Sequence, residues 1–188
     1  SRALLMNPDV ILADEAISAL DVSLRVEMMD LMLDLQDDFD TSYIFISHDL
    51  SNARYFTAHG EGSIGVMYLG EVVEYGPAEE MVNSPRHPYS KVLRWATPDL
   101  SLRETGEAPM RKIDIPDPIN PPSGCRFHTR CPEAREACRQ EKPPVYEAGD
   151  QRVTCFREDE SHAYWESPEL VDEEEDDVPG AGGDATAD

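Results

Sequence analysis

The chain has 188 residues and a mass of 21.1 kDa, enough for one domain with a hydrophobic core and some appendages. Its 39 acidic and 16 basic residues give a formal net charge of −23, which argues against binding nucleic acid through a basic face. The longest apolar runs are only a few residues, whereas a helix that crosses a bilayer needs about 20, so no membrane span is expected. No secretory signal opens the sequence, and its helix-like start at Ser1 leads us to expect that the native N-terminus lies further upstream.

The acidic excess is uneven along the chain. Residues 158–188 hold 13 acids and no Lys or Arg, including six consecutive acids at 172–177. Such a block repels itself and cannot bury apolar surface, so we expect residues 158–188 to form a disordered acidic tail. The remaining excess of acids suits a protein that stays soluble where salt screens charge, and a halophilic source is our hypothesis.

Residues 1–100 are expected to form an α/β unit. Short apolar runs at 10–13 and 43–46 are typical of buried parallel strands, and a helix is expected between them over residues 18–39. Two apolar stripes along this helix predict that much of its surface is covered. The order strand, helix, strand predicts a βαβ unit with a right-handed crossover. The later elements expected are a helix at 50–57, strands at 65–69 and 71–75, a helix beginning at Pro77 and a helix at 88–96.

Residues 101–157 have a different composition. Nine of the fifteen prolines fall between residues 98 and 144, and all four cysteines lie in this part of the chain. A segment so rich in loops needs some cross-link or bound group to hold one shape. We therefore treat it as an extension that follows the α/β unit and precedes the acidic tail.

Polar side chains follow both predicted strands where each strand ends. Asp14 and Glu15 come after the first strand, and His48 follows the second. Because ligands of open α/β sheets bind at the carboxyl ends of the strands, these three side chains are expected to face one crevice. One carboxylate would hold Mg²⁺ and the other would deprotonate an attacking water, with His48 contacting a phosphate oxygen. The alternative is an ordinary polar strand end, since Asp-Glu pairs are common and a lone histidine is usually structural.

These residues stand in segments that resemble a known family. Residues 10–21 resemble the Walker B segment and D-loop of ABC transporter ATPases, and residues 46–50 resemble their H-loop. Residues 1–10 are similar to the end of the helix that follows the family's signature motif. Three later stretches, 66–76, 84–89 and 118–132, resemble one class of this family, which imports dipeptides, oligopeptides or nickel. The stretch 118–132 is similar to the C-terminal extension of that class. The ordered set covers about residues 1–157.

The resemblance implies a role for each matching residue. Asp14 would organise the Mg²⁺ shell, Glu15 would be the general base for water attacking the γ-phosphate of ATP, and His48 would sense that phosphate. Asp21, with Ser18, would lie in the loop that communicates across a dimer of ATPase subunits. The fold implied is the C-terminal part of a P-loop, ABC-type nucleotide-binding domain, followed by the cysteine-containing extension and the acidic tail.

Some family features are missing from the sequence. It contains no G-x-x-x-x-G-K-[ST] phosphate loop, and the glutamine loop and glycine-rich signature motif would precede Ser1. Ala16 replaces a proline that is common in the family, and residues 58–63 are longer and richer in glycine than the usual link. The chain alone is therefore expected neither to bind ATP tightly nor to hydrolyse it.

The second candidate site is the cysteine set, Cys125, Cys131, Cys138 and Cys155, spaced C-x₅-C-x₆-C-x₁₆-C. A cytosolic setting disfavours disulfides, and four cysteines could hold zinc or an iron–sulfur cluster. The spacings are wider than the usual zinc pairs, and some members of the resembling class carry a [4Fe–4S] cluster here. Neighbouring arginines would lower the thiol pKa values and offset an anionic cluster: Arg126, Arg130, Arg135 and Arg139. His128 is an alternative ligand, and four metal-free thiols are the other interpretation.

The sequence thus predicts the second half of an Mg²⁺-dependent ATPase subunit that energises import of peptides, or of nickel. Its expected partners are a second ATPase subunit, two transmembrane permease subunits and, indirectly, an extracellular substrate-binding protein. It would act at the cytoplasmic face of the membrane as a peripheral protein. The alternative is a non-catalytic truncated or split chain whose four-cysteine segment binds a partner, and a third interpretation is a decayed gene product without function.

Overall fold

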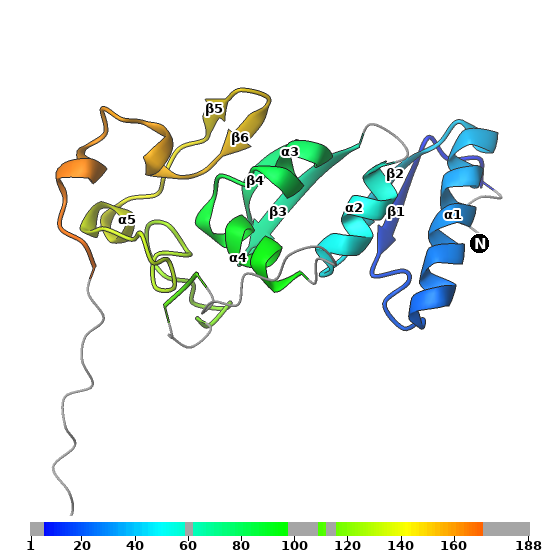
Figure 1. Ribbon diagram of the computed structural model, residues 1–188, viewed down its shortest axis with the longest axis horizontal. Coiled ribbons are helices and arrows are strands. Elements are labelled where there is room, and N and C mark those ends of the chain that lie inside the picture. Colours follow the sequence, from blue (N-terminus) through cyan, green and yellow to red (C-terminus); the bar gives the residue numbers. More distant parts are fainter. Residues whose placement is uncertain (1–5, 59–61, 98–108, 112–115, 171–188) are drawn as a thin grey trace, which may run out of the picture.

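The computed structural model describes residues 6–58, 62–97, 109–111 and 116–170. Figure 1 shows an elongated molecule in which α1, β1 and β2 lie at one end, α5, β5 and β6 at the other, and β3 and β4 between them. The α/β character expected from the sequence is confirmed. None of the helices in the described ranges combines the length and hydropathy needed to cross a membrane.

The predicted βαβ unit is present at the N-terminal end. Strand β1 (Val10–Asp14) and strand β2 (Ser42–Ile46) pair in parallel, with α1 (Val22–Phe39) between them in the chain. Helix α2 (Leu50–Ala58) follows β2 and packs on the same side as α1. A small core forms between these layers from Ala13, Ile17, Met29, Met32 and Phe56.

Both strands were expected to be buried on both faces, and the structure shows that this was wrong. Alternate residues of β1 and β2 point to opposite faces, and only one face packs on α1 and α2. The other face exposes four aliphatic side chains: Val10, Leu12, Ile44 and Ile46. Parallel sheets normally have both faces covered, so this sheet is apolar on a side that no described residue covers.

Helix α1 differs from expectation in the same way. Its N-cap is Asp21, and the helix ends at Asp40, which adopts a left-handed conformation with φ of 49°. Met29 and Met32 are buried on the sheet side. The second apolar stripe was expected to be covered, yet Leu24 and Leu31 are 45% and 47% exposed. Their side lies opposite the sheet, where the described chain supplies no packing partner.

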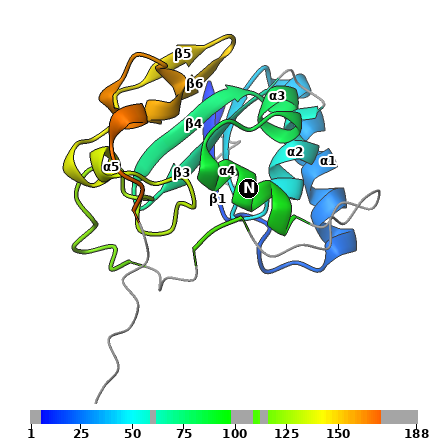
Figure 2. The same cartoon turned by 60° about the vertical axis from the view of Figure 1, so that its left-hand side comes forward.

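A second sheet joins the extension to the α/β unit. Its strands are β3 (Ser63–Tyr68), β4 (Glu71–Pro77), β5 (Tyr146–Ala148) and β6 (Gln151–Val153), all antiparallel and in the order β3-β4-β6-β5. The turn from β3 to β4 uses two left-handed residues, Leu69 and Gly70, at φ of 45° and 81°. Because β6 pairs directly with β4, the proline-rich extension completes a sheet begun by the preceding segment (Figure 2).

Helices α3 (Ala78–Asn83) and α4 (Pro88–Ala96) follow β4. The loop between them is held by Glu74, a buried carboxylate on β4 that accepts the backbone N–H groups of Arg86 at 2.7 Å and His87 at 3.0 Å. Charge-assisted bonds of this kind offset the cost of burying the carboxylate. His87 then caps α4, since its Nδ1 accepts the N–H of Tyr89.

The extension ends in short helices that pack on its loops: α5 (Glu136–Gln140), η2 (Phe156–Glu158) and η3 (Ala163–Glu166). Residues 158–170, which the sequence placed in the acidic tail, take part in this packing. Tyr164 is buried and donates its hydroxyl to the Glu133 carbonyl, and Arg135 donates to the carbonyls of Trp165 and Ser167. The six consecutive acids at 172–177 lie outside the described residues.

His87 provides a test of the packing by pH. Burial, with smaller contributions from Lys91 and Arg157, lowers its pKa from 6.5 to about 3. Above pH ~6.5 the ring is neutral in both folded and unfolded chains; as pH falls toward 3, only the unfolded chain takes up this proton. The ring should therefore reduce the free energy of unfolding by at most about 1.4 kcal/mol per pH unit across this window.

The measurement is urea denaturation at about pH 7 and pH 5. The matched variant is His87→Asn, whose side chain can still accept the Tyr89 N–H but does not titrate. The wild type should lose more stability than the variant between the two pH values. Equal losses would contradict the assignment of a buried neutral ring.

Candidate functional site

The carboxylate of Glu15 lies against His48 at the ends of the two parallel strands. Glu15 follows β1, and its backbone N–H donates to the carbonyl of Ile46, the last residue of β2, at 3.1 Å. Its φ of 46° is a left-handed conformation that non-glycine residues adopt infrequently. Oε1 accepts the His48 backbone N–H at 3.0 Å, and the ring Nδ1 lies 3.0 Å from Oε1 and 3.1 Å from Oε2.

These contacts fix the orientation of the His48 ring. A carboxylate accepts hydrogen bonds only, so Nδ1 carries the hydrogen and Nε2 is the other ring atom that a ligand can meet. Both side chains are reachable from solvent, with His48 76% and Glu15 38% exposed. A hydrogen-bonded pair this exposed stabilises the fold by no more than about 1 kcal/mol, so its geometry is set by the strands that carry it.

Asp14 is placed next to this pair by the sheet. It is the last residue of β1, exposed, and in register with Ile46 of β2. The structure therefore collects Asp14, Glu15 and His48 at one sheet edge, as the sequence predicted. Two carboxylates and an imidazole in this position can offer oxygen ligands to a divalent cation, an acceptor for a water proton and a contact for an anionic group.

The loop from Glu15 to Asp21 is held by its own side chains. Ser18 donates its hydroxyl to the Glu15 carbonyl at 2.9 Å, and Asp21 accepts the N–H of Leu24 at 3.0 Å as the N-cap of α1. Arg25, which sequence reasoning missed, donates to the carbonyls of Leu20 at 2.8 Å and Ser18 at 3.2 Å. In the sequence, Arg25 is marked only by its position one turn after the N-cap. Many helix residues share that position, so it does not predict a contact with the loop.

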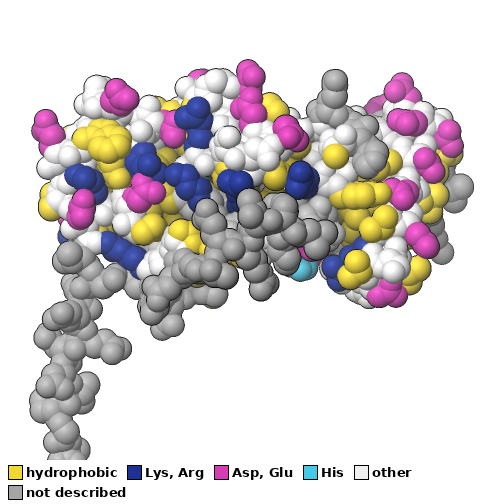
Figure 3. All heavy atoms as spheres, in the orientation of Figure 1, with side chains coloured by type: hydrophobic (Ala, Val, Ile, Leu, Met, Phe, Trp, Pro, Cys, Tyr) yellow, Lys and Arg dark blue, Asp and Glu magenta, His cyan; other side chains and the backbone are white. Residues whose placement is uncertain are grey.

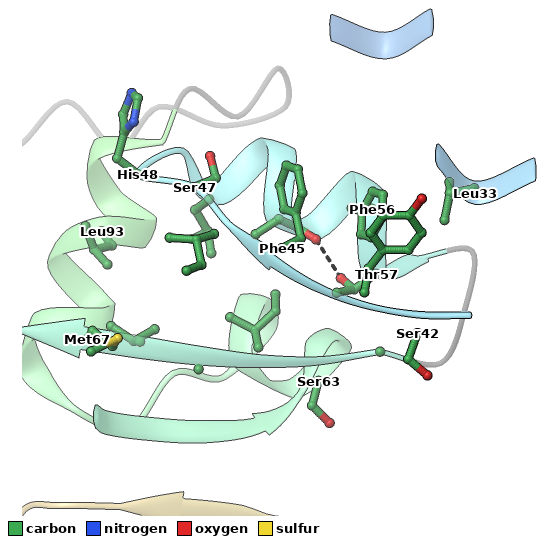
Figure 4. Close-up of a pocket in the computed structure, with 18 of the residues that line it drawn as sticks. Leu33, Ser42, Phe45, Ser47, His48, Phe56, Thr57, Ser63, Met67 and Leu93 are labelled. Carbon is green, nitrogen blue, oxygen red and sulfur yellow. Dashed lines mark hydrogen bonds between the residues drawn. The ribbon is translucent and has the colours of Figure 1, made fainter. Parts of the chain in front are cut away.

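A cavity of about 570 Å³ lies between β2 and β3. Figure 4 shows it between the two strands, with Phe45 of β2 and Phe56 of α2 on one side, Met67 of β3 on the other and His48 at its edge. Strand β2 pairs only with β1, and β3 only with β4, so both strands turn an unpaired edge toward this cavity within the described chain. The candidate site thus opens onto a hollow that separates the two sheets.

The four cysteines are free thiols that lie largely inside the extension. Burial raises the pKa of Cys125 to about 12 and of Cys155 to about 11, and raises the pKa values of Cys131 and Cys138 as well. The expectation that arginines would lower these values was wrong. Arg135 and Arg157 do act in that direction, on Cys138 and Cys155, but desolvation is the larger effect.

The cysteines influence one another without forming a ligand group for a single ion. The pKa of Cys131 is raised by the other three thiols, so all four lie within electrostatic reach. Across the described residues, however, no set of three or more His, Cys, Asp or Glu side chains is arranged to hold a metal ion. The alternative ligand His128 instead contacts a backbone carbonyl, that of Cys125, through Nδ1 at 2.8 Å.

Comparisons with known proteins support the resemblance found in the sequence. Residues 73–138 match the family model for the oligopeptide/dipeptide transporter C-terminal region. The chain is 44% identical over 160 residues to the dipeptide transport ATP-binding protein DppF of Haemophilus influenzae, covering 85% of this chain and 48% of that protein. It is 43% identical to DppF of Escherichia coli over 160 residues, 85% of this chain and 47% of the relative. The oligopeptide transport ATP-binding protein AppF of Bacillus subtilis is also 43% identical, over 82% of this chain and 47% of its own length. The chain therefore spans about half the length of these curated relatives.

The loop that follows Glu15 can be tested through its cap. Asp21→Ala removes the acceptor for the Leu24 N–H and should lower the free energy of unfolding by about 1 kcal/mol. Asp21→Asn keeps an acceptor oxygen and should stay close to the wild type. Urea denaturation followed by circular dichroism measures both variants, and equal losses would show that the charge of Asp21, not its cap bond, matters.

Proposed function

We propose that the chain corresponds to the C-terminal part of the ATP-binding subunits of oligopeptide and dipeptide ABC transporters and carries part of the catalytic site of an ATPase that energises peptide uptake. This part, which we call the half-site, consists of Asp14, Glu15 and His48. The observation that carries the proposal is the contact between Glu15 and His48. The carboxylate meets both the backbone and the ring of His48 at the carboxyl ends of two parallel strands. Nucleotides bind at this edge in open α/β sheets.

Each residue of the half-site would have one task. Glu15 would accept the proton of the water that attacks the γ-phosphate. His48, with its Nδ1–H oriented by Glu15, would bind a phosphate oxygen in its doubly protonated form, which carries an Nε2–H to donate. Carboxylate oxygens suit Mg²⁺, and Asp14 beside Glu15 is the residue that would hold it. When bound, Mg²⁺ neutralises charge on the phosphates. The loop with Ser18 and Asp21 would face a second ATPase subunit.

The phosphate-binding part of the site would come from polypeptide outside this sequence. The sequence contains no phosphate loop, and the chain spans about half of its relatives' length. The apolar face of β1 and β2 and the open edges of β2 and β3 give that polypeptide a surface to cover beside the half-site. We infer that this chain alone hydrolyses no ATP and that the complete subunit works at the cytoplasmic membrane face with two permease subunits. Nickel is the alternative cargo, and a non-catalytic split chain is the alternative function.

We also propose that the four cysteines bind an iron–sulfur cluster rather than zinc. Zinc holds thiolates at about 2.3 Å, which brings four sulfurs within about 3.8 Å of one another. The spacing C-x₅-C-x₆-C-x₁₆-C, wider than the usual zinc pairs, is what favours iron. A [4Fe–4S] cluster holds its cysteines further apart, since its iron and sulfide ions lie between them. The other three thiols lie close enough to Cys131 to affect its pKa, and such proximity is compatible with this wider arrangement.

The ATPase proposal is tested by joining this chain to the part of E. coli DppF that precedes the matched region. The joined protein should hydrolyse ATP only with Mg²⁺, and Glu15→Gln should lower kcat by about 100-fold or more, because it removes the proton acceptor. The matched control is Glu27→Gln, an exposed acid on α1 that should leave kcat unchanged. A folded joined protein that binds ATP yet keeps its rate in the Glu15 variant would overturn the proposal.

The cluster proposal is tested by iron and acid-labile sulfide analysis after anaerobic purification. We expect about four irons and four sulfides per chain, lost in Cys138→Ser and kept in Ser123→Ala, an exposed residue of the same segment. One zinc per chain without iron would favour the zinc alternative. Neither metal in the folded wild type would support the metal-free interpretation.

A further inference from the structure

Arg25 is the single basic residue of α1, and its guanidinium turns back toward the loop that precedes the helix. Nε donates to the Leu20 carbonyl at 2.8 Å, and Nη2 donates to the Ser18 carbonyl at 3.2 Å. Residues 1–58 contain three arginines, no lysine and eleven acids. Figure 3 shows acidic side chains prominent over this end of the molecule. Arg25 thus bonds to two neutral carbonyls in a part of the chain that is rich in carboxylates.

The place of Arg25 in the helix has an energetic cost. It is the fourth residue of α1, and a positive charge near the N-terminus of a helix opposes the helix dipole. Hydrogen bonds donated by a charged group are stronger than those of neutral donors, and the planar guanidinium offers two donors in a fixed fork. The two carbonyl bonds offset the cost, so the loop is the part of the structure that this side chain stabilises.

Ser18 connects Arg25 to Glu15. The N–H and the hydroxyl of Ser18 both donate to the Glu15 carbonyl, at 3.2 and 2.9 Å, while the Ser18 carbonyl accepts from Arg25. Leu20, the second acceptor, donates its N–H to the carbonyl of the buried Ile17 at 3.1 Å. Hydrogen bonds therefore link the start of α1 to the backbone of Glu15 through the loop that joins β1 to α1 (Figure 1).

The backbone of Glu15 needs such support. Its φ of 46° lies in the left-handed region, where a residue other than glycine remains only if the surrounding contacts hold it. The sheet holds the N–H of Glu15 through the Ile46 carbonyl, and Ser18 holds the carbonyl of Glu15. Because the two peptide groups set the direction of the side chain, both are needed to keep Glu15 Oε1 3.0 Å from His48 Nδ1.

We propose that Arg25 is a positioning residue, which keeps the Glu15 carboxylate against His48 by holding Ser18 on the Glu15 carbonyl. The inference rests on the role proposed above for Glu15 in ATP hydrolysis. Arg25 acts through Ser18 and Glu15 and not by contact with the nucleotide. Its loss should therefore slow the hydrolytic step and leave ATP binding unchanged.

The first test follows the His48 ring of the full chain by ¹⁵N NMR and uses no nucleotide. At about pH 8, where an imidazole is neutral, the tautomer reports the hydrogen bonds of the two ring nitrogens. The wild type should hold the hydrogen on Nδ1, where the Glu15 carboxylate accepts it. Arg25→Gln removes the forked donor and should move the tautomer toward the Nε2–H form. Arg94→Gln, which removes an exposed arginine from α4, should leave the tautomer unchanged.

Arg25→Lys is the second variant, for use if Arg25→Gln does not fold. It keeps the positive charge, but an ammonium does not reproduce the fixed fork of the guanidinium. The tautomer should move in the same direction by a smaller amount. A wild-type tautomer in the folded Arg25 variant would overturn the inference, whatever the ATPase activity.

The second test is the ATPase rate of the protein joined to the preceding part of E. coli DppF, expressed per bound nucleotide so that unfolded protein does not count. Arg25→Gln should lower kcat about tenfold or more with little change in KM, since small misplacements of a reacting group slow catalysis. A loss of kcat in Glu15→Gln without one in Arg25→Gln would overturn this inference and leave the proposed function standing. A wild-type kcat in both variants would overturn the proposed function, and the tautomer alone would then decide whether Arg25 orients Glu15.

Discussion

The parallel pairing of β1 with β2 is the constraint on which the candidate site depends. Strands that run in the same direction end at the same sheet edge, and the bond from the Glu15 N–H to the Ile46 carbonyl extends the pairing one residue beyond β1. That bond holds Glu15 in a left-handed turn whose carboxylate meets His48. Because the side-chain pair is exposed and contributes little stability, the backbone fixes the geometry and leaves both side chains open to a ligand.

A second constraint joins the extension to the α/β unit. Glu74 is buried on β4, accepts two backbone N–H groups of the loop before α4, and lies beside Gln151 of β6. Arg86 extends this network by donating to Gln151 at 2.8 Å and to Glu158 at 2.9 Å. Loss of the Glu74 carboxylate would leave the backbone N–H groups of Arg86 and His87 without their acceptor. The position of α4 and the pairing of β4 with β6 therefore depend on the same group.

Sequence reasoning found the elements that local chemistry dictates. The helix expected at 88–96 coincides with α4, which has Pro88 in its first turn, and the apolar runs at 10–13 and 43–46 located β1 and β2. It missed β5 and β6, because three-residue strands in a proline-rich segment have no periodicity. β6 is defined by its pairing with β4, and β5 by its pairing with β6. It misjudged the thiol pKa values, because neighbouring arginines are visible in a sequence whereas the depth of burial is not. Arg25 was missed because the carbonyls it binds come within its reach only once the loop has folded.

The exposed apolar surfaces connect stability to the proposed activity. The open face of β1 and β2, the outer stripe of α1 and the cavity beside β2 all border the layer that carries Glu15 and His48. Burial of apolar area is the main stabilising contribution in a folded domain, so this layer has the most to gain from a covering polypeptide. If the segment that supplies the phosphate loop also covers these surfaces, it stabilises the half-site and completes it in one step. The acidic residues of the layer that carries Glu15 and His48 repel one another less as the salt concentration rises. The isolated layer is therefore expected to be least stable at low ionic strength, as the hypothesis of a halophilic source requires.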